Sequence, residues 1–141
     1  MSRILITGHG NFASGISTSL ELITGIDDSI SIVDFKANDS IEDLEIKLLE
    51  GINKDENDLI ILCDLLGGSP FKTSCLLKEK FKKRNIEIIG GINLAMLLQA
   101  YLLKDTISLN DLKSEIIKGG HDAINFFEAI KRDEYECEYG I

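Results

Sequence analysis

The sequence is poor in the residues that mark secreted and disordered chains. It contains no tryptophan, one proline (Pro70) and three cysteines among 141 residues. Because hydrophobic residues make up 44% of it, the composition is that of a folded globule without a disordered tail. Cys63, Cys75 and Cys137 are odd in number and not closely paired, so they form neither a disulfide framework nor a zinc pattern. They are better interpreted as small apolar residues in a reducing compartment.

Long apolar runs and excess positive charge are also missing. No window approaches the roughly 20 apolar residues that cross a bilayer. The first residues, Met1–Ile4, enter a short apolar run and then glycines, unlike a signal peptide. The net charge of −9 would repel nucleic acid and anionic membranes. We therefore expect a soluble cytoplasmic protein whose partners are proteins with basic patches, and not nucleic acid.

Short apolar runs bounded by Gly, Asp and Asn recur along the chain and predict buried strands. They lie at residues 4–6, 30–35, 59–63 and 86–89. Between them, apolar residues at helical spacing predict four helices, marked by Phe12, Ile16, Leu20 and Ile23, by Ile41, Leu44, Leu48 and Ile52, by Phe71, Cys75 and Phe81, and by Leu94, Leu97, Leu98 and Tyr101. This alternation predicts an α/β fold, a parallel sheet with helices on both faces.

The last third of the chain departs from this alternation. Apolar and small residues step by three and four from Leu109 to Ile130, which predicts one long helix, loosened at Gly119–Gly120. Residues 135–141 then alternate between apolar and polar side chains, which predicts a half-exposed edge strand. Such a strand invites pairing with its own sheet or with a second subunit.

Candidate functional residues follow the strands. In open α/β sheets, ligands bind beyond the carboxyl ends of the strands, where the strand order reverses. His9 follows the first strand and Asp64 the third, so the two lie side by side if these strands are neighbours. Asp64 could then accept a hydrogen bond from one nitrogen of His9 and leave the other free to attack phosphorus. Gly8 and Gly10 leave room for a donor protein.

The loop after Asp64 has the features of an anion site. Gly67 and Gly68 permit tight turns and close approach of backbone N–H groups. Ser69 suits a helix N-cap and Pro70 the first helical position, so a helix N-terminus that favours phosphate begins here.

Each feature alone has a simpler interpretation. His9 could be a hydrogen-bonded turn residue, Asp64 could cap a strand end, and the glycines could make a tight connection. Their combination at adjacent strand ends favours a functional site. His121, within a helix and followed by Asp122, is expected to be a solvated surface residue.

These motifs resemble the enzyme IIA components of the mannose-type (mannose, fructose, sorbose, N-acetylgalactosamine) phosphoenolpyruvate-dependent sugar phosphotransferase system. The resemblance rests on Gly-His-Gly at 8–10, Asp-Leu-Leu-Gly-Gly-Ser-Pro-Phe at 64–71 and Gly-Ile-Asn-Leu-Ala-Met-Leu at 91–97. It covers nearly the whole chain, so residues 1–141 are expected to form a single phosphocarrier domain. It implies a doubly wound three-layer α/β/α fold, with four parallel strands in the order 2-1-3-4. An antiparallel fifth strand would be exchanged in a dimer, in agreement with the edge strand Tyr135–Ile141.

The resemblance also implies roles for individual residues. His9 corresponds to the phosphorylated histidine and Asp64 to the carboxylate that orients it. The phosphoryl group would be bound by Gly10, Gly67, Gly68 and Ser69. No cofactor or metal is implied. The carrier HPr would donate the phosphoryl group and a separate IIB component would accept it, and a peripheral association with membrane permease components stays open.

Two alternatives share part of this pattern. A phosphohistidine subunit that serves dihydroxyacetone kinase would not be expected to carry Gly-Gly-Ser-Pro. A receiver-like regulatory domain would need an acidic pair after the first strand, where this chain has Thr7, Gly8 and His9.

Overall fold

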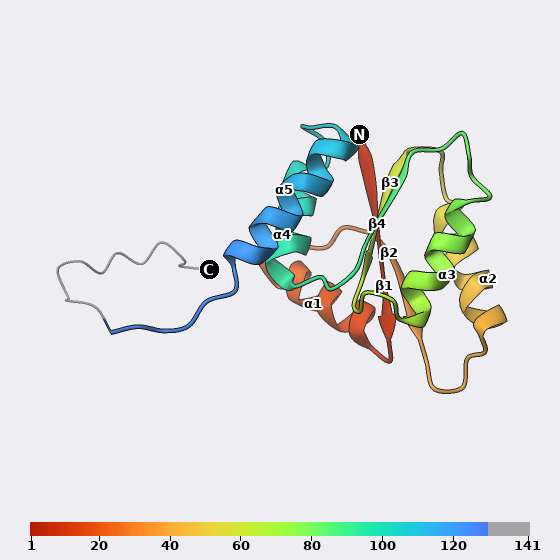
Figure 1. Cartoon of the computed structure of the whole chain (residues 1–141), viewed down its shortest axis with the longest axis horizontal. Coiled ribbons are helices and arrows are strands. Elements are labelled where there is room, and N and C mark those ends of the chain that lie inside the picture. The colour runs from red at the N-terminus through yellow and green to blue at the C-terminus, as the bar shows by residue number, and fades with distance from the viewer. Residues whose placement is uncertain (130–141) are drawn as a thin grey trace.

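The computed structural model describes residues 1–129. Strands and helices alternate along the chain. They are β1 (Ser2–His9), α1 (Phe12–Thr24), β2 (Ser31–Phe35), α2 (Ile41–Ile52), β3 (Asp58–Cys63), α3 (Ser69–Lys78), β4 (Ile86–Ile89), α4 (Leu94–Leu103) and α5 (Leu109–Asp122). Figure 1 shows the sheet between two helical layers, with α1, α4 and α5 on one face and α2 and α3 on the other. No helix in this part of the chain is long and apolar enough to cross a membrane.

The sheet is parallel throughout and has the strand order β2-β1-β3-β4, as predicted. β1 pairs with β2 on one side and with β3 on the other. In this register Thr7 lies beside Cys63, and Gly8 lies beside Asp34. The strand order reverses next to β1, so the carboxyl ends of β1 and β3 flank the switch point.

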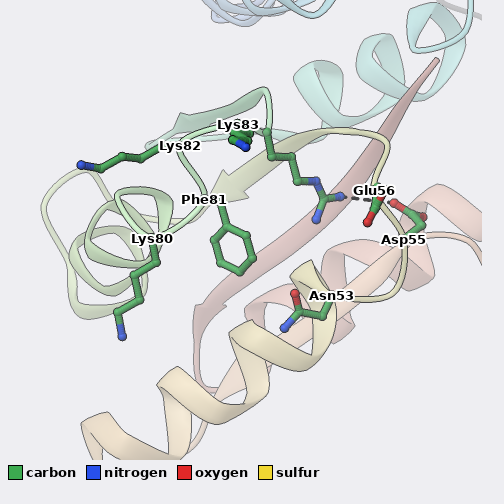
Figure 2. Close-up of a pocket in the computed structure, with 8 residues that line it drawn as sticks. Asn53, Asp55, Glu56, Lys80, Phe81, Lys82 and Lys83 are labelled. Atoms are coloured by element: carbon green, nitrogen blue, oxygen red, sulfur yellow. Dashed lines mark hydrogen bonds and ion pairs between the residues drawn. The ribbon is translucent and has the colours of Figure 1, made fainter.

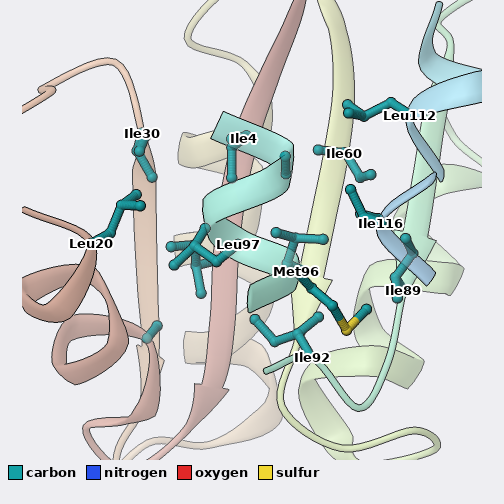
Figure 3. Packing of buried hydrophobic residues seen from close by; sticks show 14 of the residues in the cluster. Ile4, Leu20, Ile30, Ile60, Ile89, Ile92, Met96, Leu97, Leu112 and Ile116 are labelled. Carbon is teal, nitrogen blue, oxygen red and sulfur yellow. The ribbon is translucent and has the colours of Figure 1, made fainter. Parts of the chain in front are cut away.

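Two hydrophobic cores cover the two faces of the sheet. Alternate residues of a strand point to opposite faces, so Ile4 and Ile6 enter one core while Leu5 enters the other. Both cores exclude solvent, which explains why the strands read as continuous apolar runs. Figure 3 shows the core under α4 and α5, with Ile4 and Ile60 of the sheet near Met96, Leu97 and Ile116.

The last helix is shorter than predicted. It ends at Asp122, and Ala123 is its C-cap. The apolar residues that follow it are exposed within residues 1–129, Phe127 by 86%, so burial there does not extend the helix. Gly120 serves a close contact, because a Cβ there would lie 2.5 Å from the Met96 side chain. Ile130 and the predicted strand Tyr135–Ile141 lie outside the described residues.

Buried charge ties the amino ends of the strands together. The Arg3 guanidinium donates to Ser31 Oγ at 2.6 Å and to the Gly51 carbonyl at 2.6 Å, and it pairs with Asp55 at 2.7 Å. Arg84 pairs with the same carboxylate at 3.2 Å. Figure 2 shows this region, where Arg84 and Asp55 border an open cavity of about 780 Å³ at the opposite end of the sheet from His9.

Candidate functional site

His9 and Asp64 form a hydrogen-bonded pair at the switch point. His9 is the last residue of β1, and Asp64 directly follows β3. Asp64 Oδ2 accepts the His9 backbone N–H at 2.9 Å and lies 2.8 Å from His9 Nδ1. Because a carboxylate only accepts hydrogen bonds, Nδ1 is the donor in this contact, and in the neutral ring Nε2 then keeps its lone pair. The imidazole is 45% exposed while the Asp64 side chain is only 13% exposed, so Nε2 belongs to the more accessible partner of the pair.

The carboxylate of Asp64 acts on His9 alone among the described residues. Its second oxygen, Oδ1, is buried and has no hydrogen-bond partner within residues 1–129. The backbone of Asp64 is fixed, since its N–H donates to the Thr7 carbonyl at 3.2 Å and continues the β1–β3 ladder. The carboxylate therefore stands in a fixed position, ready to stabilise positive charge on the imidazole.

Gly8 makes the pair sterically feasible. A Cβ at this position would lie 2.9 Å from Asp64 Cγ and 2.7 Å from Phe12 Cδ1. Any larger residue would push the carboxylate away from His9. The sequence predicted that Gly8 leaves room for a partner protein, and this internal contact was not predicted. Gly10 does have a solvent-facing position, with a φ of 58° and nothing near its missing side chain.

The glycine loop lies directly against the histidine. A Cβ on Gly68 would be 2.8 Å from His9 Cε1, so only glycine lets the backbone approach the ring this closely. Gly67 takes a left-handed conformation with a φ of 79°, and the Gly68 N–H donates to the Leu65 carbonyl at 3.1 Å. These two glycines fold the loop back over His9.

The start of α3 differs from the prediction by one residue. Gly68, and not Ser69, is the N-cap, because its backbone is extended and its carbonyl accepts the Lys72 N–H at 2.9 Å. Ser69 is the first helical residue, and no side chain within the described residues caps this N-terminus. The first N–H groups of a helix lack intrahelical acceptors and attract anions. The uncapped end of α3 thus supplies donors beside His9.

The loop after β4, which begins at Gly90, packs against the glycine loop. A Cβ on Gly90 would lie 2.6 Å from Leu66 Cα, so the two loops touch through their backbones. Asn93 caps α4 by accepting the Met96 N–H at 3.0 Å and donates to the Gly120 carbonyl at 3.1 Å. The third family-like stretch, residues 91–97, therefore has a structural task next to the site.

The end of β2 also reaches the site, and sequence reasoning missed it. The Phe35 carbonyl accepts the Gly10 N–H at 2.8 Å, and the Phe35 and His9 ring centroids are 6.0 Å apart. The one available signal was the position of Phe35 at the carboxyl end of a strand that neighbours β1.

Other reactive side chains do not share the environment of His9. His121 is exposed near the end of α5, as predicted, and borders a shallow cavity of about 280 Å³ beside β4. Burial raises the pKa of the Cys63 thiol to about 12, so that cysteine is not a nucleophile at neutral pH. The pKa of Cys75 is also raised by burial.

Fold and site together define a doubly wound α/β protein with a carboxylate-held histidine at its switch point. Residues 3–117 match the family model EIIA-man, whose description is PTS system fructose IIA component. The chain belongs to this family, and the resemblance inferred from its motifs is confirmed. It is therefore a component of the sugar phosphotransferase system with a phosphoryl-carrier role in sugar uptake.

Individual relatives agree with this assignment. The fructose-specific EIIA component of Bacillus subtilis (strain 168) is 25% identical over 118 residues, covering 82% of this chain and 80% of the relative. The sorbose-specific EIIA component of Lacticaseibacillus casei is 26% identical over 117 residues, covering 82% and 83%.

Solved structures share the fold. The phosphotransferase system component EIIA from Streptococcus agalactiae superposes with a TM-score of 0.84 at 34% identity, covering 89% of this chain and 97% of that one. The mannose/sorbose-specific IIA subunit from Enterococcus faecalis has a TM-score of 0.80 at 20% identity, covering 92% and 97%.

Proposed function

We propose that His9 accepts a phosphoryl group from HPr and passes it to a separate IIB component. The observation that carries this proposal is that one imidazole nitrogen of His9 is held by Asp64 while the ring stays exposed. Asp64 holds Nδ1 at 2.8 Å, while the ring is 45% exposed. A neutral imidazole with a fixed tautomer and an accessible second nitrogen is a competent nucleophile. We also propose that residues 1–141 form one phosphocarrier domain that works in the cytoplasm.

The transfer follows from this geometry. The Nε2 lone pair attacks the phosphorus of the donor phosphohistidine in line with the donor's P–N bond. A new P–N bond forms at Nε2, the donor bond breaks, and the donor nitrogen retains the electron pair. His9 becomes more positive as the bond forms, and the fixed Asp64 carboxylate stabilises that charge without rearrangement. The second transfer, to the IIB component, reverses these steps with a new acceptor.

The oxygens of the transferred group would be received mainly by the free N–H groups at the start of α3, because the Gly10 and Gly68 N–H groups already donate to the Phe35 and Leu65 carbonyls. Gly67, Gly68 and Ser69 bring the loop and the uncapped start of α3 to the imidazole, and Gly10 directly follows His9. Backbone N–H groups at a helix N-terminus stabilise phosphate through hydrogen bonds and the helix dipole. The closeness of Gly68 to His9 Cε1 supports a role for this loop in binding the phosphoryl group.

Protein partners have a suitable surface around the site. Leu65 and Leu66 are 58% and 70% exposed in the loop that covers His9. Exposed leucines beside a catalytic group are typical of an interaction surface. The chain has a net charge of −9, which would attract a basic patch on a donor and accelerate the encounter.

We further propose that residues Tyr135–Ile141 add an antiparallel strand in a homodimer. β4 ends the sheet, so its outer edge is available for pairing with a strand. The shallow apolar cavity beside that edge is lined by side chains such as Ile88 and Leu66 and would receive the apolar face of the strand. Analytical ultracentrifugation of the chain with and without residues 131–141 tests this. The full chain should sediment as a dimer and the shortened chain as a monomer. Equal proportions of dimer in the two chains would argue against the proposal.

Labelling with phosphoenolpyruvate, enzyme I and HPr tests the carrier role. We expect the wild type and His121→Ala to gain one phosphoryl group by intact-mass spectrometry, and His9→Ala to gain none. The two variants remove the same kind of side chain from exposed positions, so the comparison controls for general effects on the surface. Equal labelling of His9→Ala would refute the assignment.

A further inference from the structure

The carboxyl end of β2 forms a third contact with the reacting histidine. Asp64 holds His9 at Nδ1, and the Gly68 backbone lies against Cε1. The Phe35 ring also packs against the imidazole, with its centroid 6.0 Å from that of His9 and the two planes at 61°. This edge-to-face arrangement is the favourable geometry for two aromatic rings.

The side chain and the backbone of Phe35 act on different groups. Its carbonyl accepts the Gly10 N–H at 2.8 Å and so holds the turn that follows His9. That bond does not depend on which side chain occupies position 35. A substitution of Phe35 therefore removes the ring contact with His9 and keeps the backbone contact with Gly10.

The end of β2 is itself held in place. The Asp34 carboxylate accepts the Ser14 hydroxyl at 2.6 Å and the Ser14 backbone N–H at 3.0 Å. Ser14 lies in the first turn of α1, whose own N-cap residue, Asn11, makes no side-chain cap. Asp34 thus caps α1 from a neighbouring strand and joins the end of β2 to the helix that follows His9.

We propose that Phe35 is a positioning residue for the transfer. It restricts the swing of the imidazole about its bond to Cβ, so that Nδ1 stays on Asp64 while Nε2 faces the incoming phosphorus. This proposal rests on the proposed function of His9. The hydrogen bond to Asp64 alone allows the ring to pivot about Nδ1, whereas the neighbouring Gly68 backbone and Phe35 ring restrict that pivot. Preorganisation of this kind accelerates transfer because the reacting atoms need less reorientation.

The test compares Phe35→Leu with two other variants. Phe35→Tyr keeps the ring and should restore the wild-type behaviour. Ile32→Ala truncates another apolar residue on the same edge strand, one that is 43% exposed and remote from His9, and so measures the effect of weakening β2. Thermal unfolding identifies the temperature at which all variants are folded. We expect Phe35→Leu to acquire phosphoryl groups from phosphorylated HPr about two- to tenfold more slowly, as the loss of one aromatic pair would give.

A second readout needs no phosphoryl donor. Nitrogen NMR of the His9 imidazole reports the exchange of the Nδ1 proton with solvent, which should be faster in Phe35→Leu than in the wild type, Phe35→Tyr and Ile32→Ala. Unchanged exchange, or transfer slowed equally by Phe35→Leu and Ile32→Ala, would overturn the positioning role. If the wild type itself gains no phosphoryl group from HPr, the proposed function fails, and the exchange measurement still decides whether Phe35 positions the ring.

Discussion

Gly68→Ala should disable the histidine while it leaves the fold intact. The added Cβ would lie 2.8 Å from His9 Cε1, whereas non-bonded carbon atoms prefer about 3.5–4.0 Å. The ring must therefore move by roughly 0.7–1.2 Å, and the exposed imidazole is the side that can move. Catalytic groups work within about 0.5 Å of their productive position, and a displacement of about 1 Å costs on the order of 100-fold in rate. We expect transfer from phosphorylated HPr to fall by about this factor.

A matched glycine provides the control. Gly15 lies within α1 and nothing is within 4 Å of a Cβ built there, so Gly15→Ala should leave the transfer rate unchanged. It should also raise stability by roughly 0.5–1 kcal/mol, because alanine favours the helix. Rapid-quench kinetics measures the transfer and urea unfolding the stability. Wild-type transfer in a folded Gly68→Ala protein would refute the reasoning about the contact between loop and ring.

Two further predictions concern carboxylates. Asp64→Asn should slow phosphorylation about 10- to 150-fold, the equivalent of one lost charged hydrogen bond; a quench-flow rate within twofold of wild type would contradict this. At Asp55, burial raises the pKa, but hydrogen bonds from Asn57 and Arg3 outweigh it and leave the pKa below 3.8. Because the pKa is lowered in the folded state, the ionised carboxylate stabilises the fold above pH 3.8, and this stabilisation is lost as the pH falls through the folded-state pKa. Asp55→Asn should therefore make the free energy of unfolding, measured by urea titration, fall less steeply with decreasing pH. An unchanged dependence of that free energy on pH would disprove the link.

The alternation of strands and helices was predictable because it is a local property of the sequence. Strands buried on both faces give continuous apolar runs, and 59–63 and 86–89 were placed within a residue of β3 and β4. The first strand, predicted at 4–6, runs from Ser2 to His9 and is longer at both ends; Ser2 and Arg3 belong to it although they are polar. Their burial depends on partners such as Ser31 and Asp55, which are remote in the sequence.

The contacts that shape the site could not be read from the sequence. The motifs placed His9 and Asp64 at neighbouring strand ends, but the distance between them depends on Gly8, whose role is visible only in three dimensions. Phe35 has no distinctive sequence pattern, and its contact with His9 follows from strand order. The predicted helix over 109–130 was wrong for residues 123–129, because periodicity alone does not show where the core surface ends.

Phosphorus–nitrogen NMR of the chain phosphorylated by HPr tests the central claim most directly. The hydrogen bond between Nδ1 and Asp64 predicts that the phosphoryl group is attached to Nε2 of His9, with Nδ1 still protonated. A phosphoryl group on Nδ1, or on a residue other than His9, would contradict the account.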